Sequence, residues 1–326
     1  MILTVTPNPA LDLTWHVDRL VPGATHRVAA GAARAGGKGI NVARVLHGQG
    51  HEVLALATVG GATGDEFARE LAASGIRHRL LPVAGATRRS VAIVDEANGE
   101  ASVLNEHGTG VTRAESATLV ATAAALGRTA GAVAICGSLP PGFEPDDLAA
   151  LVTELGAAGV PVIVDTSGPG LVAAARAGAS ALKPNREELA AATGHENPAD
   201  GARALLELGA RLVVVTLGAD GLMVVSRADA AGGIRARLPR VLHGNATGAG
   251  DAAVAAIAAA LADEPERAPE HELDAPTPAG AEARTRLARR AAAWSASAVL
   301  MPLAGSLSPD HGALEAEVVV TDEDPA

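Results

Sequence analysis

The stretch NATGAGDAAVAAIAAALA spans Asn245 to Ala262 and joins a glycine-rich turn to an alanine-rich helix. Gly248 and Gly250 lie just before Asp251. A glycine-rich turn at a helix N-terminus exposes backbone N–H groups, and the helix dipole adds positive potential. Such a turn can hold the negative charge of a transferring phosphoryl group, and an aspartate there can accept a hydroxyl proton. The alternative interpretation is that Asp251 only caps the helix and the glycines only form a tight turn.

A second glycine-rich stretch, AGGKGINVARVL, runs from Ala35 to Leu46. It departs from the phosphate loop GxxxxGK[ST], because alanine occupies position 32 and Gly39 stands where serine or threonine would bind Mg²⁺. A Gly-Gly pair that opens a helix remains, and its backbone is free to approach a ligand closely. Asn41 follows one helical turn later. A plain glycine-rich helix start is the alternative.

Away from these stretches, short apolar runs alternate with alanine-rich segments of helix length. Fully apolar strands separated by helices are typical of a parallel sheet covered on both faces, so we expect an α/β fold with three layers, α/β/α. The predicted strands include Ile2–Thr6, Val53–Val59, Ala132–Cys136, Pro161–Asp165, Leu212–Thr216 and Leu222–Ser226. The predicted helices include Gly64–Ser74, Thr112–Leu126, Asp146–Ala158 and Asp200–Leu208.

Two stretches break this alternation. Residues 14–33 and 87–105 have strand-like alternation without intervening helices, and ANGE at Ala97–Glu100 resembles a hairpin turn. They predict a small antiparallel sheet that projects from the main domain. Residues 263–280 carry four prolines among many acidic residues, and we expect a mobile surface loop there.

Composition excludes several classes of function. The net charge of −11 and the content of only two Trp and two Phe argue against nucleic acid as a partner, and the charge also argues against an anionic membrane. The single cysteine, Cys136, lies in an apolar run and predicts a buried thiol and a cytoplasmic protein. The opening MILTVTPNPALD lacks the basic region of a signal peptide, and no apolar run is long enough to span a membrane.

Only two lysines occur among 26 basic residues. Both lie in short motifs, Lys38 in AGGKGIN and Lys183 in LKPNREEL. Lysine is a compact point charge suited to a phosphate oxygen, so we expect both lysines to meet phosphate or sugar. Compositional bias explains the low number of lysines but not their positions.

Further candidate residues follow predicted strands or precede predicted helices. Each also has an ordinary structural interpretation: a loop aspartate, a turn serine, a plain hairpin, solvated surface charge or a helix cap. They are Asp12 in TPNPALD, Ser138 in CGSLPPG, Thr216 to Gly221 in TLGADG, the pair Arg88 and Arg89, and Lys183, Asn185 and Glu188 in KPNREE.

Taken in this order, the motifs resemble the phosphofructokinase B family of ribokinase-like sugar kinases. The resemblance covers nearly the whole chain, and its two signatures are GGKGIN near the start and GAGD near the end. TPNPALD and KPNREEL look like the subgroup that phosphorylates sugar phosphates. The resemblance implies one ribokinase-like domain over residues 1–326, with a mostly parallel central sheet and a small antiparallel lid formed by about 12–34 and 87–106.

The resemblance also implies roles at matching positions. Asp251 would be the catalytic base, and Gly248, Ala249 and Gly250 the anion hole. The substrate would be bound by Asp12, Gly37, Lys38, Asn41, Arg88, Ser138 and Arg27. ATP would be bound by Lys183, Asn185, Glu188, Thr216, Gly218 and Gly221, and Glu188 would position Mg²⁺ through water. The lid would form a homodimer contact.

The implied activity is the ATP-dependent phosphorylation of a ketohexose phosphate, with fructose 1-phosphate as the first candidate. Tagatose 6-phosphate and fructose 6-phosphate stay open, and Asn245, Ala252 and Ala253 depart from the usual residues around GAGD. A kinase of an unphosphorylated sugar would not need Arg88. A non-catalytic sugar-phosphate sensor would not need Asp251.

Overall fold

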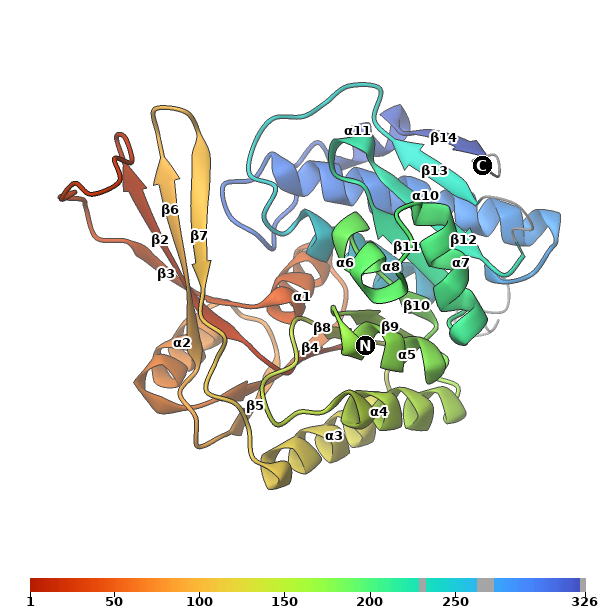
Figure 1. Cartoon of the computed structure of the whole chain (residues 1–326), viewed down its shortest axis with the longest axis horizontal. Helices are drawn as coiled ribbons and strands as arrows, with labels where there is room; N and C mark the ends of the chain where they lie inside the picture. Colours follow the sequence, from red (N-terminus) through yellow and green to blue (C-terminus); the bar gives the residue numbers. More distant parts are fainter. Residues whose placement is uncertain (229–232, 263–272, 323–326) are drawn as a thin grey trace.

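The computed structural model describes residues 1–228, 233–262 and 273–322. Figure 1 shows a large sheet with helices on both faces and a smaller sheet that projects beside it. The large sheet contains β1 (Ile2–Thr6), β4 (Val53–Val59), β5 (His78–Pro82), β8 (Ala132–Cys136), β9 (Val162–Asp165), β10 (Ala181–Leu182), β11 (Leu212–Thr216), β12 (Leu222–Ser226), β13 (Ile234–Arg237) and β14 (Val319–Asp322).

The order of the large sheet is β14-β13-β12-β11-β10-β9-β8-β1-β4-β5. The pairs from β11 to β5 are parallel, whereas β11–β12, β12–β13 and β13–β14 are antiparallel. The mostly parallel sheet predicted from the apolar strands is therefore confirmed.

Helices form the two outer layers, because successive strand residues point to opposite faces and each face is apolar. In β8, for example, Ala132 and Ala134 face one core and Val133 and Ile135 face the other. The first core packs against α1 (Lys38–Gly48), α2 (Gly61–Ala73), α8 (Ala249–Ala262), α10 (Pro278–Val299) and α11 (His311–Glu317). The second packs against α3 (Arg113–Gly127), α4 (Pro145–Ala157), α5 (Pro169–Arg176), α6 (Arg186–Thr193) and α7 (Pro198–Leu208).

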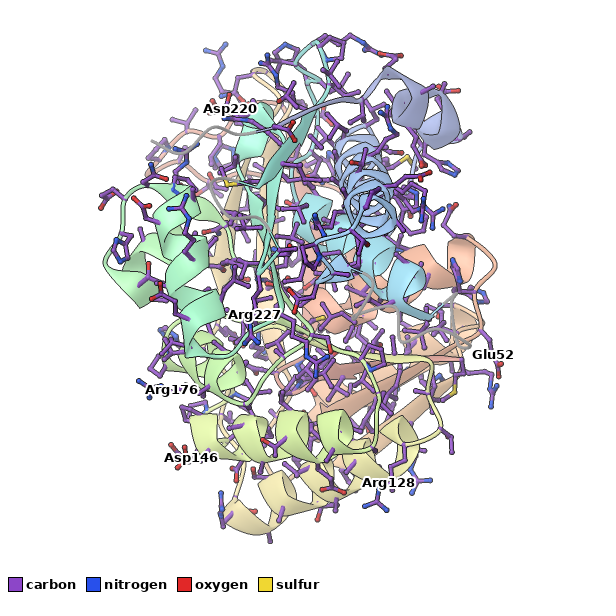
Figure 2. The ribbon with its side chains drawn as sticks, turned by 90° about the vertical axis from the view of Figure 1, so that its right-hand side faces the viewer. Glu52, Arg128, Asp146, Arg176, Asp220 and Arg227 are labelled. Atoms are coloured by element: carbon purple, nitrogen blue, oxygen red, sulfur yellow. The ribbon has the colours of Figure 1, made fainter. Side chains whose placement is uncertain are left out.

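The outer surface of the second helical layer carries charge. Figure 2 shows Arg128, Asp146 and Arg176 on the solvent side of α3, α4 and α5, and all three residues are exposed. The apolar faces of these helices hold the layer against the sheet, and their charged faces are solvated.

The small sheet contains β2 (Ala10–Val17), β3 (Ala32–Gly36), β6 (Arg88–Asp95) and β7 (Glu100–Asn105), in the order β3-β2-β6-β7. Its two hairpins are antiparallel, as predicted, and β2 and β6 join them in parallel. The turn predicted at Ala97–Glu100 joins β6 to β7, with Gly99 at φ 73°. We call this unit the four-stranded sheet.

The proline-rich loop expected over 263–280 mostly lies outside the described residues. Its last part differs from the prediction, because Leu273 is buried and Pro278 begins α10 behind the N-cap Thr277. Proline is well suited to the first turn of a helix, where its missing N–H has no partner to lose.

None of the helices in the described part of the chain combines the length and the apolar character that a membrane crossing requires.

Candidate active site

The candidate site lies where several strands of the large sheet end. In an open α/β sheet, ligands bind outside the carboxyl ends of the strands. Here a cavity of about 760 Å³ is bounded by these ends, by the four-stranded sheet and by the first turns of α1 and α8. Of the predicted residues it is lined by Asp12, Gly37, Lys38, Asn41, Arg88, Ser138, Lys183, Asn185, Glu188, Thr216, Gly248, Gly250 and Asp251.

A second cavity of about 590 Å³ adjoins the first. It is lined by Gly218 and Gly221 in the turn between β11 and β12, and by Ala249 of α8. The turn includes the 3-10 helix η1 (Gly218–Asp220). Part of the lining of this cavity is apolar, formed by Val241, Leu242, Ala292, Ala296 and Val299. Both cavities are lined by Asn185, Thr216 and Gly250, so a long ligand could reach from one to the other.

Asp251 lies in the first turn of α8 and lines the larger cavity, next to Gly250, which lines both. Its side chain is buried, and Asn41 Nδ2 donates a hydrogen bond of 2.8 Å to Oδ2. Burial, followed by the charge of Asp165, raises the pKa of Asp251 to about 6, against the opposing effects of Lys38 and Asn41. A carboxylate with this pKa is well matched to accept a proton near neutral pH.

Asp165 ends β9 beneath the cavity and is completely buried. Its Oδ1 atom lies 2.9 Å from Lys38 Nζ and 3.5 Å from Lys183 Nζ, and Oδ2 has no hydrogen-bond partner among the described residues. Burial opposes the charge of Lys38, but the carboxylates of Asp165 and Glu188 outweigh it and raise the pKa of Lys38 above its ordinary value. The two lysines therefore flank one buried carboxylate.

Asp12 lies on β2, and a neighbouring glycine leaves room for its carboxylate. A Cβ atom at Gly36 would lie 1.9 Å from Asp12 Oδ2, so only glycine fits there. Burial raises the pKa of Asp12 to about 6, while Arg88 is the strongest of the nearby cations that oppose the shift. A partly buried carboxylate at a cavity wall is a strong acceptor for hydroxyl groups.

Arg88 begins β6 and brings a cation to the same wall. Its Nε donates to Asn8 O and its Nη1 to Glu106 O, both at 3.3 Å. Among the described residues no carboxylate lies within ion-pair distance of Arg88, and burial lowers its pKa from the ordinary value. Ser138 lies nearby, because Asn8 Nδ2 donates to its Oγ at 2.9 Å. This pair can receive an anionic group.

The helix-cap interpretation of KPNREE is confirmed. Asn185 Oδ1 accepts from Glu188 N at 2.7 Å, and Glu188 Oε2 accepts from Asn185 N at 2.9 Å, which is a capping box at the start of α6. Glu188 Oε1 lies 3.6 Å from Lys38 Nζ at the cavity wall. The cap thus fixes a carboxylate whose second oxygen faces the site.

One predicted substrate residue, Arg27, lies away from the site. Arg27 lines neither cavity and is exposed on the segment between β2 and β3. Lys183 does not line the smaller cavity that Gly218 and Gly221 share. It is buried beside the larger one, with Nζ 3.1 Å from where a Cβ of Gly250 would stand.

Several lining residues were not identified from the sequence. Asp165 could have been found, because it is a carboxylate at the end of a buried parallel strand. The others lie on β6 and β7, follow β1, β7 and β9, or precede α8: Asn8, Ser90, Asn105, Glu106, His107, Thr166, Ser167 and Thr247.

The chain is similar to known sugar-phosphate kinases. It is 40% identical over 271 residues to a 1-phosphofructokinase of Xanthomonas campestris pv. campestris, which covers 80% of this chain and 84% of that protein. It is 37% identical over 262 residues to a 1-phosphofructokinase of Rhodobacter capsulatus, with 78% and 82% covered. Its fold matches phosphofructokinase-2 from Escherichia coli in complex with fructose-6-phosphate at a TM-score of 0.81 and 28% identity, over 97% and 98% of the two chains.

A family model supports the same assignment over most of the chain. The model of the pfkB family carbohydrate kinases matches residues 7–304, which include the glycine-rich turns before α1 and α8 and every predicted site residue. The GGKGIN and GAGD stretches thus both lie within the region that one family model matches. By this match and by its relatives, the chain belongs to the pfkB family of carbohydrate kinases.

Proposed function

We propose that this kinase transfers the γ-phosphoryl group of ATP to the 6-hydroxyl of fructose 1-phosphate and forms fructose 1,6-bisphosphate and ADP. The observation that carries the proposal is the position of Asp251, a buried base that lines the larger cavity at the start of a helix, directly after Gly250, which lines both cavities. The relatives in Xanthomonas and Rhodobacter bear the name of this activity.

The reaction begins with the sugar in the larger cavity. Asp251 accepts the proton of the substrate hydroxyl as its oxygen attacks the γ-phosphorus, and the bond between that phosphorus and the β–γ bridging oxygen breaks. ADP leaves with the bridging oxygen. The backbone N–H groups of the Gly248–Gly250 turn and the dipole of α8 stabilise the charge that develops on the transferring group.

The sugar is held by groups that line the larger cavity. Asp12, Gly37 and Asn41 bind its hydroxyl groups, and Asn41 also keeps Asp251 oriented through the 2.8 Å hydrogen bond. Arg88 and Ser138 bind the phosphate that the sugar carries. An unpaired cation at this wall favours a phosphorylated substrate over a neutral sugar.

ATP occupies the smaller cavity and reaches Gly250 with its phosphates. Thr216, Gly218 and Gly221 contact the nucleoside end, while Asn185, Lys38 and Lys183 approach the phosphates. Gly221 has φ 84°, and a Cβ atom at this position would lie 2.2 Å from Ala236 O. A side chain there would therefore disrupt the turn.

Residues that fit Mg²⁺ are present at the wall of the larger cavity. Asp165 Oδ2 is buried without a partner, and Glu188 Oε1 faces the cavity. No group of three His, Cys, Asp or Glu side chains gathers among the described residues, and Mg²⁺ is usually bound by one or two carboxylates and substrate phosphates. Bound there, Mg²⁺ would neutralise phosphate charge, with Glu188 as a ligand through water and Asp165 beside it.

The four-stranded sheet serves as a lid and as a dimer contact. Its edge strand β7 is exposed along its whole length, and Val103 and Leu104 are 47% and 60% exposed. Exposed apolar residues on an edge strand favour pairing with a second copy. In such a dimer Arg27 could approach a site from the exposed segment between β2 and β3.

The buried Cys136 fits a reducing cytoplasm.

A coupled assay tests this function. ADP release is measured with ATP and, in turn, fructose 1-phosphate, fructose 6-phosphate and tagatose 6-phosphate. The proposal predicts the highest kcat/KM with fructose 1-phosphate. A higher value with either of the other two sugar phosphates would overturn the substrate assignment, and no ADP release with any of them would overturn the activity.

A further inference from the structure

Arg34 connects the four-stranded sheet to a loop of the main domain that lies far away in the sequence. It lies on β3, and its Nη1 donates a hydrogen bond of 2.7 Å to the carbonyl oxygen of Ala304. Arg34 lines neither cavity, and among the described residues it forms no ion pair with a carboxylate. Its side chain therefore contacts the loop that follows α10.

That loop supports the glycine turn before α8. A Cβ atom at Gly248 would lie 2.6 Å from Ala304 Cβ and 2.9 Å from Ala304 Cα. Gly248 has φ 86°, a conformation that other residues rarely adopt. Ala304 therefore packs directly against the backbone of the turn that faces the transferring phosphoryl group.

The same loop has two further attachments. Asn245 Nδ2, in the turn itself, donates to Pro302 O at 3.0 Å. Gly305 packs against Arg44, because a Cβ atom at Gly305 would lie 3.0 Å from both Cβ and Cδ of that side chain. Arg34 is the attachment that comes from the four-stranded sheet.

Arg34 is also placed opposite a substrate-binding residue. In the β2–β3 hairpin, Arg34 and Asp12 are register partners. Burial, and then the charge of Arg44, lowers the pKa of Arg34, while the carboxylates of Glu70 and Asp12 oppose that shift. One hairpin thus carries both Asp12, which is proposed to bind the sugar, and Arg34, which donates a hydrogen bond to the loop that packs on the glycine turn.

We propose that Arg34 is a positioning residue: through Ala304 it fixes the Gly248 turn relative to Asp12 and the bound sugar. The inference rests on the phosphoryl-transfer role proposed above for that turn. A misplacement of about 1 Å can lower a rate by about 100-fold, because the donors then miss the position where charge develops.

Kinetics of Arg34→Ala test the inference. We expect kcat to fall by about 10- to 100-fold, with KM for the sugar phosphate and for ATP within about two-fold of the wild type, because neither ligand touches Arg34. Arg34→Lys should regain part of the loss, since an ammonium group can still donate to the carbonyl. Arg19→Ala, on the exposed segment after β2, is the matched control and should behave as wild type.

A double-mutant cycle distinguishes positioning from an independent effect. Ala304→Gly removes the methyl group that packs on Gly248. If Arg34 acts through Ala304, the double variant loses less kcat than the product of the two single losses. Strictly multiplicative losses, or an Arg34→Ala variant with wild-type kcat, would overturn the proposal.

Amide hydrogen exchange of the ligand-free protein gives a readout that needs no activity. Arg34→Ala should speed exchange in peptides that cover residues 244–251, and Arg19→Ala should not. Unchanged exchange in Arg34→Ala would contradict the inference even if the kinase is active. Faster exchange in a protein that phosphorylates no sugar phosphate would instead contradict only the proposed function.

Discussion

Lys183 lies 3.5 Å from Oδ1 of the fully buried Asp165, which Lys38 also contacts at 2.9 Å. These are the only two lysines of the chain, and the fold brings both to one carboxylate. Asp165 and Lys183 are both buried, whereas the Lys38 side chain is 37% exposed, so Asp165 depends on the two lysines to offset the cost of burying its charge.

Removal of Lys183 should therefore destabilise the fold. Loss of one partner from a buried ion pair costs about 3–5 kcal/mol, and because Lys38 remains we expect Lys183→Met to lower the free energy of unfolding by about 1–3 kcal/mol. The double variant Lys183→Met/Asp165→Asn should recover part of this loss. Urea denaturation measures both, and a single variant as stable as the wild type would show that Lys183 does not stabilise Asp165.

The raised pKa of Asp251 predicts how activity depends on pH. The carboxylate must be ionised to accept a proton, and its pKa is about 6. Because this pKa is that of the protein without substrates, kcat/KM for fructose 1-phosphate should be level above pH 7 and fall about ten-fold per pH unit below 6. A kcat/KM that stays constant between pH 5 and pH 8 would mean that Asp251 does not limit the reaction.

Gly36→Ala should weaken sugar binding selectively. A methyl group there would lie 1.9 Å from Asp12 Oδ2 and would displace the carboxylate. Loss of a charge-assisted hydrogen bond costs about 1.5–3 kcal/mol, so KM for fructose 1-phosphate should rise about 10- to 100-fold while KM for ATP stays unchanged. Gly48→Ala, where nothing lies within 4 Å, is the control. Equal rises in both KM values would contradict this role.

Arg88→Ala should affect phosphorylated sugars alone. A dianion left underpaired in a partly closed site costs about 2–5 kcal/mol, which corresponds to a fall in kcat/KM of about 30-fold or more. Any weak activity on free fructose should hardly change. Equal losses on fructose 1-phosphate and free fructose would assign Arg88 to support of the four-stranded sheet.

The sequence predicted the elements whose residues carry a local signal. Ala132–Cys136 and Leu212–Thr216 are strands with the predicted bounds, because buried parallel strands are continuously apolar. The start of α10 at Pro278 was missed, because a run of prolines and acids was interpreted as a loop although proline also begins helices.

The site was predictable only in part, for a physical reason. Glycine turns and helix starts are local, so Asp251 and Asn41 could be singled out as candidates. The contacts of Asp165 with both lysines and of Arg34 with Ala304 join segments 18 to 270 residues apart, and they depend on strand order and loop packing. Arg27 is the opposite case. The resemblance implied that it binds the substrate, but in the structure it is exposed and lines neither cavity.

The kcat of Asp251→Asn with ATP and fructose 1-phosphate tests the central claim most directly. We predict a fall of about 10²–10⁴-fold. The fold should persist at pH 7.5, because the raised pKa makes the ionised carboxylate a burden on stability that grows as pH rises from about 4 to about 6 and that asparagine removes. The exposed Asp146→Asn on α4 is the control. A folded Asp251→Asn variant that keeps more than about a third of the wild-type kcat would contradict the assignment of Asp251 as the base.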